Sequence, residues 1–164
     1  MTAAPAEPGQ QQPGRRARLT PRRLTPQPLA LHELTLRIYY EDTDFSGFVY
    51  HANYLRFMER GRTEWLRGLG IDQHAAFAMS PPLAFVVRRM TIDYLRPARM
   101  DDLVKVETGL VEMRGASLDL TQRVRRGEDT LVEANITVAC VAGGRPVRLP
   151  RLIHEVLAAR QGGD

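Results

Sequence analysis

The chain has 164 residues, a formal net charge of +4 and a sequence pI near 9.7. Its excess positive charge is confined to residues 1–30, which hold five of the 23 basic residues and one of the 19 acidic ones. Residues 31–164 therefore carry 18 charges of each sign, so the basic pI does not indicate a nucleic-acid-binding domain, and we expect no nucleic-acid partner. The length predicts one domain.

The single cysteine and the absence of long apolar stretches narrow the cellular context. One cysteine excludes an intramolecular disulfide and fits a reducing compartment. Cys140 lies in an apolar run, which favours a buried hydrophobic side chain over a nucleophile. No stretch reaches the roughly 18 apolar residues of a membrane span, and the N-terminus lacks the apolar region of a secretory signal. We therefore expect a cytoplasmic protein.

Residues 1–30 differ in composition from the rest of the chain, since they hold six of the eleven prolines. A segment of this kind buries too little surface to offset its ordering entropy, so we predict a disordered tail. Its arginines would give at most weak peripheral contact with an anionic membrane, at roughly 1 kcal/mol each. We place the folded domain at residues 31–160.

The first two elements of that domain are a strand and a long helix. Alternation over residues 35–40 predicts a strand with Leu36, Ile38 and Tyr40 on one face. Residues 51–70 carry an apolar stripe at helical spacing, and two glycines near its end stop the helix. Gly61 lies on that stripe and predicts a close approach of the helix to a sheet. The apolar positions are Tyr54, Leu55, Met58, Trp65, Leu66 and Leu69.

Four more strands are predicted at residues 84–95, 103–113, 116–126 and 131–142, followed by a short helix at 152–160. Their short connections favour antiparallel neighbours. The fold class is therefore α+β, with a five-stranded antiparallel sheet and one long helix on one face. A bare second face would expose a large apolar patch, so we expect an oligomer.

The loop between the first strand and the helix contains the densest group of polar residues. Three carboxylates, Glu41, Asp42 and Asp44, precede Gly47, and His51 stands at the start of the helix. A helix N-terminus offers unpaired N–H groups and partial positive charge, which suit an oxyanion. A carboxylate beside it can activate water or attack an acyl carbon.

Other interpretations of this loop remain open at this point. Asp42, Asp44 and His51 could ligate a metal, but their spacing fits no compact metal motif. Ser46 lacks the surroundings of a nucleophilic serine, and the single glycine does not make a phosphate-binding loop. A capped turn with solvated acids explains the composition equally well.

The segments EDTDFSGFVYHANYLRFMERGRTEWL and FVVRRMTIDYLRPARMDDLV together resemble the hotdog-fold acyl-CoA thioesterases. The nearest branch is that of 4-hydroxybenzoyl-CoA thioesterase, and more closely the group associated with the Tol–Pal envelope system of Gram-negative bacteria. The loop pattern D-x-x-G-x-V-x-H-x-x-Y is present as Asp44, Gly47, Val49, His51 and Tyr54. The match covers roughly residues 35–150.

The resemblance implies a sheet wrapped around one central helix, and homodimers or tetramers with active sites at the dimer interface. It implies that Asp44 is the catalytic nucleophile or general base, with the backbone N–H of His51 as oxyanion donor. Acyl-CoA is then the substrate, and no metal or other cofactor is required. Tyr40, Gly47 and Asn53 are expected to line or shape the substrate site.

Charged residues outside the loop allow two further interpretations. Another hotdog branch carries its catalytic acid on the central helix, where this chain has Glu59 and Glu64, but nearby arginines favour an ion-paired helix face. Arg88 and Arg89 lie in the second strand, and with Arg96 and Arg99 they form a basic rim that suits the phosphates of coenzyme A.

Two alternatives to a thioesterase remain. A hydratase of the same fold would use a histidine with an acidic partner in a different loop. A non-catalytic scaffold would bind acyl-CoA or acyl carrier protein, and it would have no need of an aspartate directed at the carbonyl.

Overall fold

The computed structural model describes residues 31–161, and the tail predicted at residues 1–30 lies outside them. Predicted and observed boundaries agree within two residues for the long helix, the four later strands and the terminal helix. In chain order the elements are β1 (Leu31–Arg37), the 3₁₀ helix η1 (Tyr40–Asp42), α1 (His51–Gly68), α2 (Gln73–Phe77), β2 (Leu83–Tyr94), β3 (Leu103–Arg114), β4 (Ser117–Arg126), β5 (Asp129–Ala142), β6 (Arg145–Pro146) and α3 (Arg151–Gln161).

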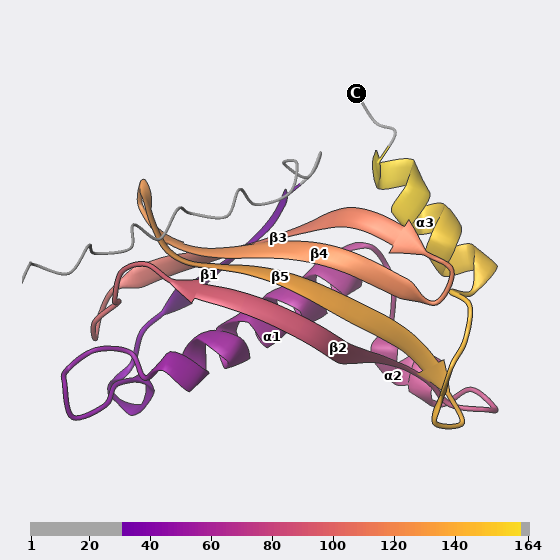
Figure 1. Cartoon of the computed structure of the whole chain (residues 1–164), viewed down its shortest axis with the longest axis horizontal. Helices are drawn as coiled ribbons and strands as arrows, with labels where there is room; N and C mark the ends of the chain where they lie inside the picture. The colour runs from indigo at the N-terminus through magenta and orange to yellow at the C-terminus, as the bar shows by residue number, and fades with distance from the viewer. Residues whose placement is uncertain (1–30, 162–164) are drawn as a thin grey trace, which may run out of the picture.

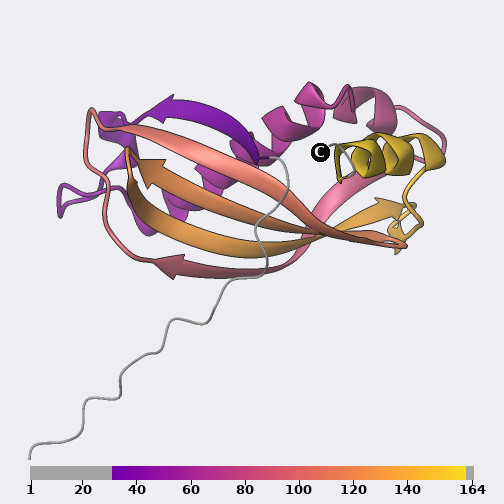
Figure 2. The same ribbon diagram turned by 90° about the horizontal axis from the view of Figure 1, so that it is seen from above.

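The strands form one curved antiparallel sheet in the order β1-β3-β4-β5-β2, and the short β6 pairs with β5. Figure 1 shows α1 running beneath this sheet, and Figure 2 shows the sheet curling around it. This confirms the predicted α+β hotdog fold. The sheet has two edges, β1 and β2, and β2 is a strand of 12 residues.

The face of α1 that packs on the sheet differs slightly from the predicted stripe. Tyr54, Met58 and Trp65 are buried as expected, but Leu55 is exposed and Phe57 is buried in its place. At 100° per residue, position 57 lies about 60° from position 54 on one side, whereas positions 58 and 55 lie about 40° and 100° from it on the other, so the buried face extends toward Phe57 and Leu55 lies at its margin. The side chains of Phe57 and Met58 are among the largest that are fully buried.

Gly61 brings α1 against β3 and β4, which confirms the predicted close approach. A Cβ at this position would lie 2.7 Å from Cγ1 of Val106 and 3.1 Å from Oγ1 of Thr108. No side chain larger than hydrogen fits at these distances without movement of the sheet. The glycine therefore sets the spacing between the helix and the sheet.

The prediction of a bare apolar second face is wrong. Because side chains alternate along each strand, the residues next to those that meet α1 point to the convex face of the sheet. That face carries charges and hydroxyls, and ion pairs cross it between Lys105 and Glu33 (2.8 Å) and between Arg123 and Glu133 (3.2 Å). Such a face does not need an apolar cover, so it gives no reason to expect an oligomer.

The first strand also differs from its prediction. β1 spans Leu31–Arg37, and Tyr40 belongs to η1 instead of continuing the strand. The carboxylate of Asp42 accepts a hydrogen bond from the N–H of Tyr39 at 2.9 Å and turns the chain there. Ile38 is buried as predicted, whereas Tyr40 is 80% exposed. The short α2 and β6 had no counterpart in the predicted elements.

Candidate active site

The loop between η1 and α1 is held by its own backbone and by the segment that follows β2. The N–H of Asp44 donates to Phe48 O (2.9 Å) and the N–H of Gly47 donates to Asp44 O (3.0 Å). Gly47 has φ of +75°, in the left-handed region that favours glycine. Phe48 forms a bridge with Arg99, whose guanidinium lies 4.7 Å from the centre of its ring. These contacts fix the conformation of the segment that presents Asp44.

Asp44 is exposed at the tip of this loop, and its carboxylate is bound by Ser46. Oδ1 of Asp44 accepts hydrogen bonds from the Ser46 N–H (2.8 Å) and from the Ser46 hydroxyl. These bonds, with the hydroxyl as the larger cause, lower the pKa of Asp44 below its ordinary 3.8, and the charge of His51 contributes in the same direction. Asp44 is therefore a carboxylate at neutral pH, as a nucleophile or general base requires.

The start of α1 provides the electrophilic side of the site. Tyr50 precedes the helix and makes no side-chain cap. The N–H of Asn53 donates to Tyr50 O at 2.8 Å, but the N–H of His51 finds no acceptor among residues 31–161. Unpaired amides in the first turn of an 18-residue helix favour negative charge. A thioester oxygen that becomes negative during reaction would be stabilised there.

Asn53 connects the helix to the loop. Its side-chain amide donates to Asp42 O at 2.9 Å, and the same carbonyl accepts the N–H of Tyr50 at 2.9 Å. The sequence did not distinguish a structural role for Asn53 from contact with the substrate. The structure gives its side chain a structural partner.

Tyr94, at the end of β2, is a neighbour of the site that the sequence did not single out. Its hydroxyl donates to His51 O at 3.2 Å, and its ring meets the His51 ring edge-on with centroids 6.1 Å apart. Burial raises the pKa of Tyr94, so its hydroxyl keeps its proton at neutral pH. The sequence shows that Tyr94 stands at the end of a predicted strand. It does not show that this end lies beside the start of α1, because that is a tertiary contact.

The structure brings together only some of the predicted site residues. Asp44, Gly47, His51 and Asn53 belong to one loop and helix start, and Tyr40 lies just before them in η1. Arg88 and Arg89 lie in the middle of β2, about 16–20 Å along the strand from Tyr94. Within one chain they are therefore separated from the Asp44 loop.

The glutamates of α1 are ion-paired, as the arginines near them predict. Arg62 pairs with Glu59, and Arg67 pairs with Glu64. Arg62 is buried, and its second contact is to Oε1 of Gln122 at 2.8 Å. Nε2 of Gln122 in turn donates to Met58 O (2.9 Å) and to Thr108 Oγ1 (2.7 Å). A connected polar network thus lies between α1 and the sheet, and Glu59 is its exposed end.

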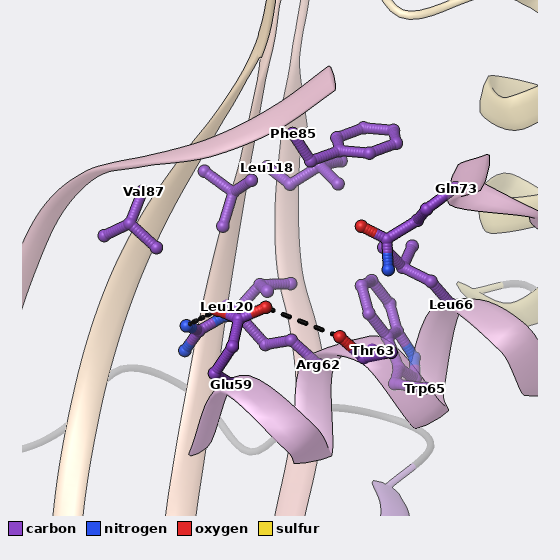
Figure 3. A pocket seen from close by; sticks show the side chains of 11 residues that line it. Glu59, Arg62, Thr63, Trp65, Leu66, Gln73, Phe85, Val87, Leu118 and Leu120 are labelled. Atoms are coloured by element: carbon purple, nitrogen blue, oxygen red, sulfur yellow. Dashed lines mark hydrogen bonds and ion pairs between the residues drawn. The ribbon is translucent and has the colours of Figure 1, made fainter. Parts of the chain in front are cut away.

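A small cavity lies beside this network, between α1 and the strands β2, β4 and β5 (Figure 3). Its volume is about 60 Å³. The polar residues Glu59, Arg62 and Thr63 border it on α1 and Gln73 borders it on α2. Its remaining lining is apolar: Trp65, Leu66, Phe85, Val87, Leu118, Leu120 and Val138.

Three further findings concern the residues that the structure describes. None of them form a group of three or more His, Cys, Asp or Glu side chains placed to hold a metal ion. None of the helices among residues 31–161 is long and apolar enough to cross a membrane. Cys140 is buried, as predicted, and burial raises the pKa of its thiol.

The fold and the sequence profile define the class of this protein. The sheet curled around one long helix is the hotdog fold, and the sequence profile of the Thioesterase superfamily matches residues 46–133. The chain belongs to this superfamily.

Individual relatives agree with that assignment. The Acyl-CoA thioester hydrolase YbgC of Escherichia coli O6:H1 is 48% identical over 121 residues, which cover 72% of this chain and 89% of the relative. The Acyl-CoA thioesterase YbgC of Haemophilus influenzae is 47% identical over 126 residues, 76% of this chain and 90% of the relative.

Solved structures show the same fold. A probable thioesterase from Bartonella henselae has a TM-score of 0.71 and 43% identity, and the match covers 74% of this chain and all of that one. A thioesterase from Thermus thermophilus, solved as a complex with coenzyme A and Zn, has a TM-score of 0.69 and 27% identity. That match covers 80% of this chain and 95% of the other.

Proposed function

We propose that this protein hydrolyses acyl-CoA thioesters to the free acid and coenzyme A, with Asp44 as the catalytic carboxylate. The observation that carries the proposal is the ionised, exposed Asp44 in the loop that leads into the uncapped start of α1. The names of the YbgC relatives support acyl-CoA as the substrate class.

In this mechanism the thioester oxygen accepts a hydrogen bond from the N–H of His51. The positive end of α1 stabilises the oxygen as it becomes negative, and one such donor contributes about 2.7–4 kcal/mol in the transition state. Asp44 then acts in one of two ways. It attacks the carbonyl carbon and expels the thiolate, after which water hydrolyses the anhydride, or it removes a proton from an attacking water.

The remaining predicted residues have supporting roles in this proposal. Gly47 permits the left-handed turn that presents Asp44, and Asn53 holds the helix start to the loop. Tyr40 and the His51 side chain are exposed beside the loop, where they can contact the substrate. Arg88 and Arg89 are exposed and make no ion pair with any of residues 31–161, so they are available to the phosphates of coenzyme A.

We also propose that the active form is a homodimer, alone or doubled to a tetramer, joined through β2. The outer edge of β2 has no strand beside it within residues 31–161, and Val86 and Val87 are 42% and 46% exposed there. A long edge with apolar side chains is suited to pair with a second copy. Antiparallel pairing would place the end of one β2, with Tyr94 and the helix start, beside the beginning of the other. Arg88 and Arg89, in the middle of the strand, would then lie between the two sites, about 16–20 Å along β2 from each.

The test is thiol release from a panel of acyl-CoA substrates by wild-type protein and by Asp44→Asn. We expect a loss of at least about a thousandfold in kcat with the elution volume of the oligomer unchanged. Glu41→Gln removes an exposed carboxylate from the neighbouring η1 and serves as the matched control, with activity near wild type. Turnover by Asp44→Asn close to that of wild type would refute the assignment of Asp44.

The same panel separates the alternatives. Acyl-CoA or acyl carrier protein binding without thiol release would indicate a scaffold, and hydration of enoyl-CoA would indicate a hydratase. We propose that no metal participates, so activity should survive dialysis against a chelator. We also propose that the protein is cytoplasmic, which cell fractionation tests. We propose that it associates with the Tol–Pal system, which co-purification with the envelope proteins tests.

A further inference from the structure

Tyr94 connects the end of β2 with the start of α1. Figures 1 and 2 both show the arrowhead of β2 at the end of the molecule where α1 begins. The backbone of Tyr94 is part of the sheet, where it pairs with Val132 on β5. The next two N–H groups, those of Leu95 and Arg96, both donate to Leu131 O, at 2.8 and 3.0 Å. The tyrosine therefore reaches the helix from a backbone that the sheet holds fixed.

The side chain of Tyr94 contacts two aromatic residues in the first turn of α1. Its ring lies edge-on to the ring of His51, with centroids 6.1 Å apart, and meets the ring of Tyr54 at 5.9 Å. Tyr54 is buried, and its hydroxyl accepts the N–H of Ala98 at 2.8 Å. Edge-to-face ring pairs of this kind are attractive beyond the area that they bury. They hold the phenol so that its hydroxyl reaches His51 O at 3.2 Å.

This hydroxyl acts on the peptide unit next to the proposed oxyanion donor. The N–H of His51 and the carbonyl of Tyr50 belong to one planar peptide unit, so the bond from the Asn53 N–H to Tyr50 O (2.8 Å) restrains both groups. His51 O belongs to the following unit and accepts the Tyr94 hydroxyl. The two units share the Cα of His51. Their bonds together therefore determine the direction of the His51 N–H.

The start of α1 needs such a restraint from outside the helix. The first four N–H groups of a helix have no partner within it, and the residue before α1 makes no side-chain cap. Fraying at this end would turn the N–H of His51 away from the thioester oxygen. A donor stabilises a developing negative charge best when it is already oriented before the reaction. Tyr94 supplies, from the end of β2, the restraint that a capping side chain would otherwise give.

We propose that Tyr94 is a positioning residue of the hydrolysis, whose hydroxyl holds the first turn of α1 so that the N–H of His51 points at the thioester oxygen. The inference rests on the proposed function, in which that N–H is the oxyanion donor. Tyr94 makes no bond to Asp44, whose carboxylate is bound by Ser46. Loss of the hydroxyl should therefore lower the rate of reaction without changing the ionisation of Asp44.

The test is Tyr94→Phe, which removes the hydroxyl and keeps the ring. Removal of an oxyanion donor lowers kcat about 10²–10³-fold, and a misdirected donor keeps part of its effect, so we expect kcat to fall about tenfold with KM within about twofold of wild type. The pH at which kcat/KM falls on the acidic side should stay at its wild-type value. The midpoint of urea unfolding should change little, because the side chain is half-exposed. Tyr39→Phe is the control, because it removes a hydroxyl from an exposed tyrosine whose ring does not contact His51, and it should keep the wild-type kcat.

NMR order parameters of the His51 and Ala52 N–H groups measure the restraint itself, independently of activity. In Tyr94→Phe they should fall below the rigid range of about 0.85, and in Tyr39→Phe they should remain there. Order parameters or a kcat that Tyr94→Phe leaves unchanged would overturn the inference.

Three other results would overturn it as well. A higher KM with unchanged kcat would mean that the hydroxyl contacts the substrate itself. An equal fall of kcat in Tyr39→Phe would mean that the effect is not specific to Tyr94. A large fall in the unfolding midpoint of Tyr94→Phe would indicate a role in stability alone. Absence of thiol release by wild-type protein would instead refute the proposed function, while the order parameters would still test the restraint, so the two failures are distinguishable.

Discussion

Gly61 offers a quantitative test of how closely α1 is held to the sheet. In Gly61→Ala the new Cβ would meet Cγ1 of Val106 at 2.7 Å, about 1 Å inside ordinary contact, and Nε2 of Gln122 at 3.2 Å. Val106 is fully buried, so its side chain cannot move into solvent to relieve the contact. Overpacking of this kind costs about 1–3 kcal/mol, and disturbance of the Gln122 hydrogen bonds adds about 1 kcal/mol. Alanine returns about 1 kcal/mol through its helix propensity.

The free energy of unfolding of Gly61→Ala should therefore fall by about 1–3 kcal/mol. Gly68→Ala is the matched control on the same helix, because its Cβ would meet only the His32 ring, at 3.6 Å. The control should be unchanged or up to about 1 kcal/mol more stable. Urea denaturation gives the free energy of unfolding of both variants, provided that the slope m is the same in each. A Gly61→Ala protein as stable as Gly68→Ala would refute the close approach.

Three further predictions concern the site and its support. Ser46→Ala should raise the pKa of Asp44, because both Ser46 hydrogen bonds favour the carboxylate and the hydroxyl bond is lost. In a plot of kcat/KM against pH, the fall in activity on the acidic side should then occur at higher pH than in wild type. If that fall stays at the wild-type pH, Asp44 is not the group whose titration causes it. Since the folded pKa of Asp44 is depressed, its contribution to stability is present above the unfolded pKa and is lost as pH falls through the folded pKa. Asn53→Ala removes a bond from helix to loop and should lower kcat about fivefold with little change in the midpoint of unfolding, whereas an unchanged kcat would leave Asn53 without a role in positioning. Arg62→Met and Gln122→Leu should each destabilise the fold by about 2–4 kcal/mol, and the double variant should lose clearly less than their sum; strict additivity would mean that the two side chains do not interact.

The long helix and most of the strands could be predicted from the sequence. The period of apolar residues predicted the long helix and four of the strands within two residues, because burial of one face imposes that period on the chain. It predicted too that Gly61 faces the sheet, since only a close approach explains a glycine on an apolar stripe. The local motif around Asp44 placed the aspartate, the glycine and the helix start in one loop, where the structure finds them.

Other features depend on contacts between residues distant in the chain. The polarity of the convex face became visible only once the strands were in register. Tyr94 reaches His51 across 43 residues, and Arg62 reaches Gln122 across 60. The cavity is bounded by two helices and three strands, so its volume is a property of their packing. Sequence alone determined the hotdog elements and the loop of Asp44, because local periodicity and turn chemistry encode them. Tertiary structure decided the neighbours of His51 and the shape of the pocket, because side chains from separate elements meet there only after folding.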